Sequence, residues 1–308
     1  MALDQHTDTD PPAAPASAAV APRGHTRWNA VFRFGAHVVS IVVGLVTIPF
    51  LIKHMGVAVY GIIGTINTLL NLMTIATSAL GSTVGRNMTF AVEQQDYPRA
   101  ARELSTAFFG LLLLFLAALP LLGAGAWYID ALIKVPAGYE GPTRLLFGLM
   151  TLSFILTTLG GPLSAAMFVR NRLDLSSAVS LVRALLMLAA ILGLFTLWHT
   201  QYLLLYGAII VGCSLVEFLL RLRIHAYLLP GIRLARRAFH REVLRGAASL
   251  GGWMTLIQVG LILYSQFDML VANRVLGPEG AGYLAGIASV PLQIRALASM
   301  VQSLFTPN

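Results

Sequence analysis

Charged residues are scarce in this sequence. They make up 11% of its 308 residues, whereas hydrophobic residues make up 57%. A soluble domain of this size carries about 25% charged residues, so the chain has too little polar surface for a water-soluble fold. Its apolar residues form long blocks near the roughly 20 residues that a helix needs to span the hydrocarbon core. The blocks are neither short nor alternating, as barrel strands would be, and they predict an all-α polytopic transmembrane bundle.

Cysteine and acidic residues are also few. The one cysteine, Cys213, excludes an intrachain disulfide, and no metal-ligand spacing surrounds it. We therefore expect neither a metal site nor a cofactor. There are 13 acidic against 21 basic residues, which gives a net charge of +8. The basic residues cluster at the ends of the apolar blocks, a pattern of membrane orientation and not of nucleic-acid binding.

About eight transmembrane helices are predicted after a disordered tail. Residues 1–22 are rich in Ala, Pro, Asp and Thr, which indicates disorder, and their acidic residues do not fit a signal peptide. The predicted helices cover Phe34–Ile52, Val57–Leu80, Ser105–Tyr128, Leu145–Val169, Ser176–Trp198, Tyr202–Leu220, Ala247–Ala272 and Gly282–Phe305.

The connections between these helices carry basic residues unequally. One set of connections holds four: Lys53, Lys134, Arg144 and Arg274. The alternate set holds fifteen: Arg23, Arg27, Arg33, Arg86, Arg99, Arg102, Arg170, Arg172, Arg221, Arg223, Arg233, Arg236, Arg237, Arg241 and Arg245. Basic connections stay in the cytoplasm. We therefore expect a multi-pass protein of the inner (plasma) membrane with its N-terminus in the cytoplasm.

The chain contains a sparse internal repeat. The shift along the sequence that places Gly56 on Gly277 also places Gly61 on Gly282, each pair within a turn between two helices. The repeat predicts a first six-helix bundle at 27–222, a basic cytoplasmic linker at 223–246, and the first two helices of a second bundle at 247–308.

Four segments in order resemble a known family. They are Lys53–Gly61, Leu80–Arg86, Glu93–Ala100 and Val275–Tyr283. Together they resemble the polysaccharide biosynthesis and O-antigen flippases of the multidrug/oligosaccharidyl-lipid/polysaccharide exporter superfamily. The resemblance implies two pseudo-twofold-related six-helix bundles around a central cavity that opens alternately to the two membrane faces. It also implies a polyprenyl-pyrophosphate-linked glycan as substrate, membrane lipid as surroundings, and no covalent chemistry.

The chain departs from this family in its number of helices. Members have twelve or more, so we expect this chain to be C-terminally truncated. A missing C-terminal half or polysaccharide assembly proteins are therefore expected partners. Whether the chain transports alone, or is a non-transporting remnant, is left open by the sequence.

Arginines are the candidates for binding a pyrophosphate. Arginine stays charged and binds phosphate bidentately, which offsets the cost of desolvating the phosphate. Arg183 and Arg295 lie within predicted helices, whereas Arg33 and Arg86 lie at cytoplasmic helix ends. Snorkelling to the interface is an equal alternative for Arg183, and orientation signals suit Arg33 and Arg86 better.

Four further polar residues are candidates. Asn67, Asn71 and Thr74 share one helix face and could bind sugar hydroxyls, or could join helices through hydrogen bonds. Asp268 could couple transport to an ion, or could pair with Arg274. Glu217 and Arg221 lie one helical turn apart, which predicts a structural ion pair.

Two other functions compete with the flippase. A drug/cation antiporter of the same superfamily would need a carboxylate in the first bundle, and the first five predicted helices contain none. A membrane glycosyltransferase would need converging acidic or histidine groups. The largest periplasmic connection offers only Asp130 and Glu140, so we expect no enzyme.

Overall fold

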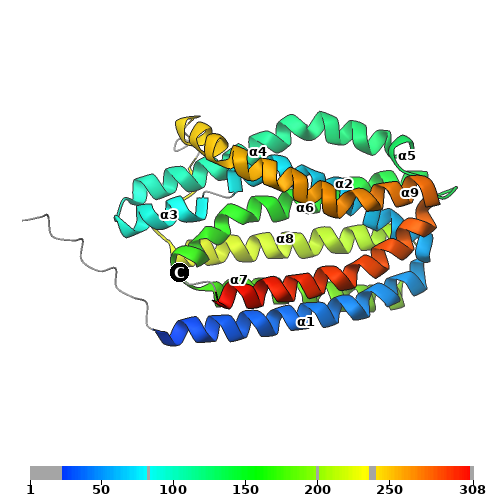
Figure 1. Ribbon diagram of the computed structural model, residues 1–308, viewed down its shortest axis with the longest axis horizontal. Coiled ribbons are helices and arrows are strands. Elements are labelled where there is room, and N and C mark those ends of the chain that lie inside the picture. Colours follow the sequence, from blue (N-terminus) through cyan, green and yellow to red (C-terminus); the bar gives the residue numbers. More distant parts are fainter. Residues whose placement is uncertain (1–22, 82–83, 199–200, 236–240, 306–308) are drawn as a thin grey trace, which may run out of the picture.

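The chain is an all-α bundle of long, roughly aligned helices. A computed structural model describes residues 23–81, 84–198, 201–235 and 241–305, which contain helices and no strands. The long helices are α1 (Arg23–Met55), α2 (Val57–Gly81), α4 (Tyr97–Trp127), α6 (Glu140–Val169), α7 (Leu173–Leu197), α8 (Tyr202–Leu228) and α9 (Arg241–Phe305) (Figure 1). In this part of the chain, seven helices are long and apolar enough to cross a membrane. The predicted fold class is therefore confirmed.

The helices extend beyond the apolar blocks from which they were predicted. The third span begins at Tyr97, well before its predicted start at Ser105, because Asp96 caps it by accepting a hydrogen bond from the Arg99 backbone N at 2.9 Å. Pro98 occupies the first turn, where a missing N–H costs nothing. The short helices α3 (Val84–Glu93) and α5 (Ile129–Leu132) were not predicted.

The sixth predicted helix also runs further than expected. It continues to Leu228, so Arg221 lies inside α8 and does not belong to the connection in which the sequence placed it. The reason is that Arg221 has a partner one turn earlier, Glu217, so its charge does not end the helix. Arg223 lies inside α8 as well.

Two glycines make the turns that the repeat predicts. Gly56 separates α1 from α2 and has a φ of 82°. Gly277 has a φ of 81° and a ψ of −176°, and divides α9 into two arms. This conformation is open almost only to glycine, so α9 corresponds to the seventh and eighth predicted helices joined at a kink.

Replacing Gly277 with alanine is expected to destabilise the protein by about 1–3 kcal/mol, because a Cβ is strained at this φ and ψ. Gly212 in α8 provides the matched control, since its backbone is helical and no atom lies within 4 Å of an added Cβ. Thermal unfolding in detergent should show a lower midpoint for Gly277→Ala than for Gly212→Ala. Equal midpoints would mean that the kink is not strained.

The α2 and α9 helices meet in a reciprocal glycine contact. An added Cβ on Gly61 would lie 2.1 Å from the Pro278 carbonyl oxygen, and one on Gly282 would lie 2.1 Å from the Val57 carbonyl oxygen. The shift that defines the internal repeat carries Val57 onto Pro278 and Gly61 onto Gly282, so the two halves of the contact exchange roles. This reciprocity is what a local twofold relation between the two helix pairs produces.

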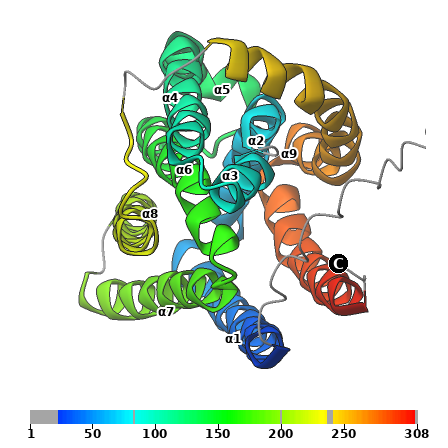
Figure 2. The ribbon, with the colours of Figure 1, turned by 90° about the vertical axis from the view of Figure 1, so that its left-hand side faces the viewer.

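The same relation recurs one turn further along. An added Cβ on Gly64 would lie 2.9 Å from the Cβ of Ala285, its own counterpart in the repeat. Small residues here let the two backbones approach closely. Thr68 of α2 donates a hydrogen bond at 3.2 Å to Oε1 of Gln266, which lies on the first arm of α9. Viewed along the bundle, α2 lies between α6 and α9 (Figure 2).

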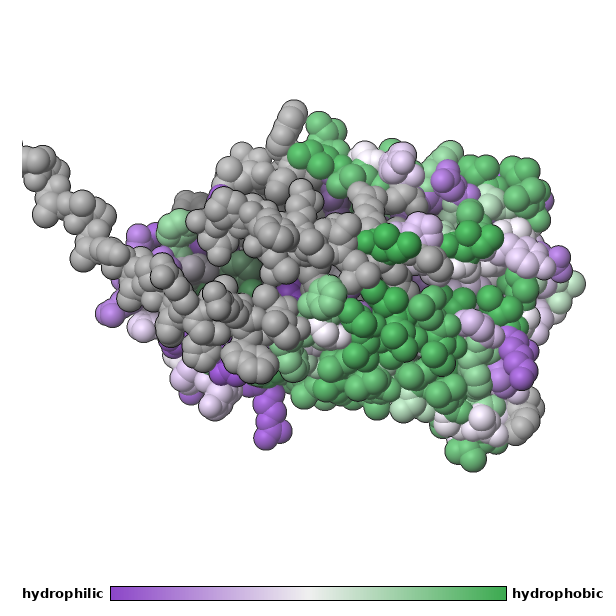
Figure 3. All heavy atoms as spheres, turned by 60° about the horizontal axis from the view of Figure 1, so that its bottom comes forward, coloured by the Kyte–Doolittle hydropathy of each residue, from purple (hydrophilic) through white to green (hydrophobic). Residues whose placement is uncertain are grey.

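The outer surface suits a lipid environment. Side chains such as Val42 on α1 and Leu116 on α4 are more than half exposed. Figure 3 shows a broad apolar band between more polar ends. An apolar surface of this extent is unfavourable in water and favourable in hydrocarbon.

Candidate functional site: an arginine-lined cavity in the bundle

A cavity of about 420 Å³ lies among α1, α2, α7 and α8. Its wall combines small and apolar residues with a few polar ones from each helix. The residues that line it are Ser40, Val43, Gly44, Thr47, Ile48, Leu51, Tyr60, Ile63, Gly64, Asn67, Ser180, Arg183, Ala184, Met187, Tyr206 and Glu217. Because α1 and α2 lie far from α7 and α8 in the sequence, no single segment indicates the cavity.

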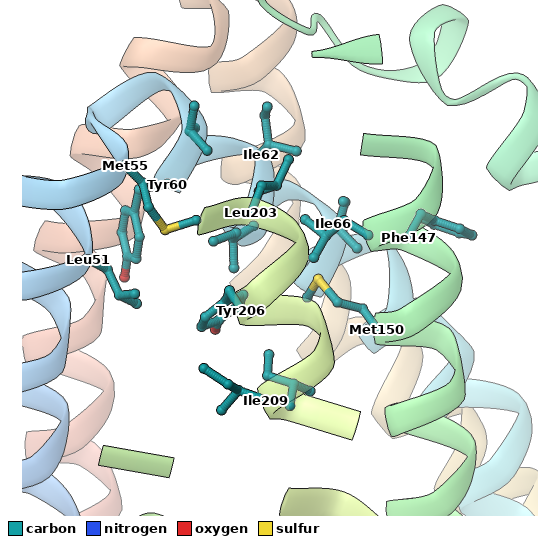
Figure 4. Packing of buried hydrophobic residues seen from close by; sticks show 14 of the residues in the cluster. Leu51, Met55, Tyr60, Ile62, Ile66, Phe147, Met150, Leu203, Tyr206 and Ile209 are labelled. Carbon is teal, nitrogen blue, oxygen red and sulfur yellow. The ribbon is translucent and has the colours of Figure 1, made fainter. Parts of the chain in front are cut away.

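The cavity ends at a packed hydrophobic cluster near the turn between α1 and α2. Leu51, Tyr60 and Tyr206 line the cavity and also belong to this cluster, together with the buried Leu203 and Ile62. Figure 4 shows these side chains gathered where α1, α2 and α8 meet. Large buried side chains therefore pack along this end of the cavity.

Most hydroxyls on the wall are already occupied by their own helices. Ser40 donates to the Ala36 carbonyl at 2.9 Å, Thr47 to the Val43 carbonyl at 2.7 Å, and Ser180 to the Ser176 carbonyl at 3.2 Å. The strongest hydrogen-bond donor that remains for a ligand is the guanidinium of Arg183.

Arg183 forms an ion pair with a buried carboxylate. Its Nε lies 3.1 Å from Glu217 Oε2, and the Glu217 side chain is 5% exposed. The other oxygen, Oε1, accepts a hydrogen bond from Arg221 on the next turn of α8. Arg221 also donates to Ser164 Oγ on α6, and its side chain packs against Gly160. Four residues from three helices thus form one polar network.

This network carries one more positive than negative charge. Arg183 and Arg221 contribute two guanidinium groups, and Glu217 contributes one carboxylate. Among the residues that line the cavity, no other one is charged. Arg183 lies almost three turns into α7, about 15 Å from the start of that helix at about 1.5 Å per residue. An unbalanced charge at this depth is costly in hydrocarbon, so the cavity favours an anionic occupant.

The structure separates the other predicted site residues. Asn67 lines the cavity with Arg183, whereas Asn71 is exposed and is not among the cavity's lining residues. Thr74 donates to the Asn71 carbonyl and so satisfies its own helix. The predicted polar stripe of α2 therefore contributes one residue to this cavity.

The remaining predicted cations lie elsewhere. Arg33 on α1 and Arg86 on α3 are both exposed and do not line the cavity. Helix α3 and the start of α1 lie at the same end of the bundle (Figure 1). Arg295 is on the second arm of α9, and its side chain lies outside the described residues.

Asp268 is exposed on the first arm of α9. In the part of the chain that the structure describes, it has no salt bridge, so the alternative of a pair with Arg274 is not formed there. Met269, Gln266 and Asn273 contact α2 or the segment after α5. At about 100° per residue, Asp268 points away from the face that these residues share.

Sequence reasoning missed the role of Glu217. The spacing of one helical turn predicted its ion pair with Arg221, which is confirmed. The third member, Arg183, lies on the preceding long helix, far from Glu217 in the sequence, and no local pattern joins the two.

A scan against protein-family models finds no match. The chain is 29% identical over 277 residues to a curated protein of Bacillus subtilis (strain 168), named "Uncharacterized membrane protein EpsK". This similarity covers 88% of the chain and 54% of that relative, so the chain spans about half of the relative's length. A solved structure named "protein A" superimposes with a TM-score of 0.67 at 12% identity, over 91% of this chain and 62% of that one. This likeness shows the fold alone.

Proposed function

We propose that this chain is part of a transporter that moves a lipid-linked oligosaccharide or polysaccharide precursor across the inner membrane by alternating access. The observation that carries the proposal is a cavity lined by Arg183, whose network with Glu217 and Arg221 has one net positive charge, inside a bundle of membrane-spanning helices. A lipid-linked glycan has a pyrophosphate that must cross the low-dielectric core. Fixed guanidinium groups in a cavity offset the cost of desolvating it.

The contact between α2 and α9 supports the two-bundle part of the proposal. Its two halves exchange roles under the shift that defines the internal repeat. Such a relation is what two equivalent bundles would produce, and it supports the proposal that the helices after Arg241 begin a second bundle. The activity then belongs to an assembly that also contains the rest of this second bundle.

The antiporter is less well supported, although one observation favours it. The cavity contains a carboxylate, Glu217, from the predicted sixth helix. A proton-coupled antiporter needs a carboxylate that takes up and releases a proton. Glu217 is instead paired with two arginines, so both of its carboxylate oxygens are engaged by fixed cations of the bundle.

The proposal is tested by transport in proteoliposomes. A fluorescent polyprenyl-pyrophosphate-linked oligosaccharide is incorporated, and a membrane-impermeant glycosidase removes the glycan from the accessible leaflet. When the protein is present and moves the substrate between leaflets, the glycosidase should consume the substrate of both leaflets. Consumption limited to the outer-leaflet share, with the full-length protein as well as with this chain, would contradict the proposed function.

The orientation is a separate prediction. We expect the end that holds the turn after α3 to face the cytoplasm, and the segment between α5 and α6 to face the periplasm. Single cysteines at the exposed Gln94 and Tyr139 test this, because the native Cys213 is buried. In spheroplasts, an impermeant maleimide should label Tyr139→Cys at once and Gln94→Cys only after permeabilisation. The reverse pattern would invert the topology.

A further inference from the structure

The two arginines of the network are held differently. Arg221 donates to both Glu217 Oε1 and Ser164 Oγ, and its stem packs on Gly160, so three groups fix its position. Arg183 is 3.1 Å from Glu217 Oε2, but its Nε is not aligned for a hydrogen bond to any atom that the structure describes. Its side chain is also the most exposed of the three, at 37% against 18% for Arg221 and 5% for Glu217.

The carboxylate therefore has one firm partner and one loose partner. If the ion pair between Arg183 and Glu217 breaks, Glu217 does not become an isolated buried charge, because Arg221 still neutralises it. Isolated charges are the main obstacle to breaking a buried ion pair. Arg183, in turn, lines the cavity and so borders the space that an occupant would fill.

We propose that Glu217 is a built-in counter-ion that competes with the ligand's phosphate group for Arg183. When the cavity is empty, Glu217 neutralises Arg183. When a phosphate or pyrophosphate enters, the guanidinium of Arg183 turns from Oε2 to the phosphate oxygens, and Glu217 stays on Arg221. The ligand supplies the negative charge that the network lacks. This inference rests on the proposed function only for the view that the phosphate belongs to a lipid-linked glycan.

Such a counter-ion has a consequence for transport. A cationic cavity without competition would hold a pyrophosphate tightly and release it slowly. Glu217 weakens ground-state binding and gives Arg183 a partner at the moment of release. Glu217 is thus a positioning residue whose removal should strengthen binding, the opposite of what damage to the fold would do.

The test measures binding of soluble probes to the full chain in phosphatidylcholine nanodiscs by calorimetry. The probes are inorganic pyrophosphate, farnesyl pyrophosphate and farnesol. Glu217→Gln should bind inorganic pyrophosphate about 10- to 100-fold more tightly than the wild type, the range for losing one competing charge pair. Arg183→Gln should bind it at least about tenfold more weakly.

A double variant decides whether Glu217 acts through Arg183. If it does, the double variant Arg183→Gln/Glu217→Gln binds pyrophosphate with the same affinity as Arg183→Gln alone, because Arg183 is no longer there for Glu217 and the phosphate to compete for. Asp174→Asn is the matched control, since it removes a carboxylate from Arg172 at the start of α7, outside the cavity. It should leave the affinity unchanged.

Glu217→Asp provides a second measurement if the glutamine variant does not fold. The shorter side chain keeps the charge and its pairing with Arg221 but retreats from Arg183, so the affinity should rise less than in Glu217→Gln and still exceed the wild-type value. An unchanged or lower affinity in every folded Glu217 variant would overturn the counter-ion.

The probes also separate the sources of the phosphate. Tighter binding of farnesyl pyrophosphate than of inorganic pyrophosphate supports a lipid headgroup, and equal binding assigns the site to free phosphates. Equal binding would contradict the proposed function while leaving the counter-ion intact. Binding of farnesol with the same affinity as farnesyl pyrophosphate would overturn the phosphate site itself.

Discussion

Gly61→Ala is expected to lower the stability of the protein by about 1–3 kcal/mol, the usual cost of overpacking a tight contact. The added Cβ would lie 2.1 Å from the Pro278 carbonyl oxygen and 2.7 Å from the Gly282 backbone N. These neighbours are backbone atoms, which cannot rotate away as a side chain end can. Helix α9 must therefore move away from α2 around the whole contact.

Gly282→Ala should have the same effect, because its Cβ meets Val57 in the reciprocal position. The double variant Gly61→Ala/Gly282→Ala should cost less than the two single variants together, since both damage one contact. Thermal unfolding monitored by size-exclusion chromatography of a fluorescent fusion measures all three. Gly212→Ala is the control, because its Cβ would meet nothing within 4 Å.

Two results would contradict the reciprocal contact. One is a midpoint for Gly61→Ala equal to that for Gly212→Ala. The other is a large effect of Gly61→Ala with none of Gly282→Ala, because a twofold contact cannot be sensitive on one side only.

Arg183→Gln is expected to abolish most transport of the lipid-linked substrate in the proteoliposome assay. Arg183 is the one charged donor on the cavity wall that α7 supplies, and a hydrogen bond to a charged group is worth about 1.5–3 kcal/mol. Its loss corresponds to a decrease in transport efficiency of about 10- to 100-fold. The transport efficiency of Arg183→Lys should fall between those of the wild type and Arg183→Gln, because lysine keeps the charge but cannot form the bidentate contact.

The control for this prediction is a second arginine next to the same helix. Arg172 precedes α7, is 46% exposed and pairs with Asp174 outside the cavity. Arg172→Gln removes the same group at the helix end and should leave transport unchanged. Equal losses in Arg172→Gln and Arg183→Gln would show that arginine acts through general charge and not through the cavity.

The fold was predicted from the sequence to a large extent, for identifiable reasons. Membrane helices satisfy their backbone within one segment, so their positions follow from local composition. The glycine repeat located both turns, at Gly56 and Gly277, because a positive φ restricts the residue type at a single position. It also paired Gly61 with Gly282, which the structure brings into contact.

The errors in the fold arise where helices leave the apolar blocks. Helix α3 is polar enough to have been assigned to a connection, although Val84, Met88 and Ala91 form a buried face. The start of α4 depends on a capping carboxylate, Asp96, and not on hydrophobicity. Composition alone gives no signal for either.

The site was predicted only in part. Arg183 was identified because an intramembrane arginine is unusual, and the structure places it in the cavity with Asn67. Glu217 was assigned a structural role because its visible partner, Arg221, was local. Its second partner, Arg183, is brought near by the packing of α7 on α8. That packing cannot be read from a single sequence.

The most direct test of the central claim is native mass spectrometry of the chain released from nanodiscs that contain a polyprenyl-pyrophosphate-linked oligosaccharide. If Arg183 binds the pyrophosphate, the wild-type protein should retain the lipid-linked oligosaccharide, Arg183→Gln should lose it, and Glu217→Gln should retain more of it. Retention by Arg183→Gln at the wild-type level, or no retention by any form of the protein, would contradict the assignment of this cavity to a lipid-linked glycan.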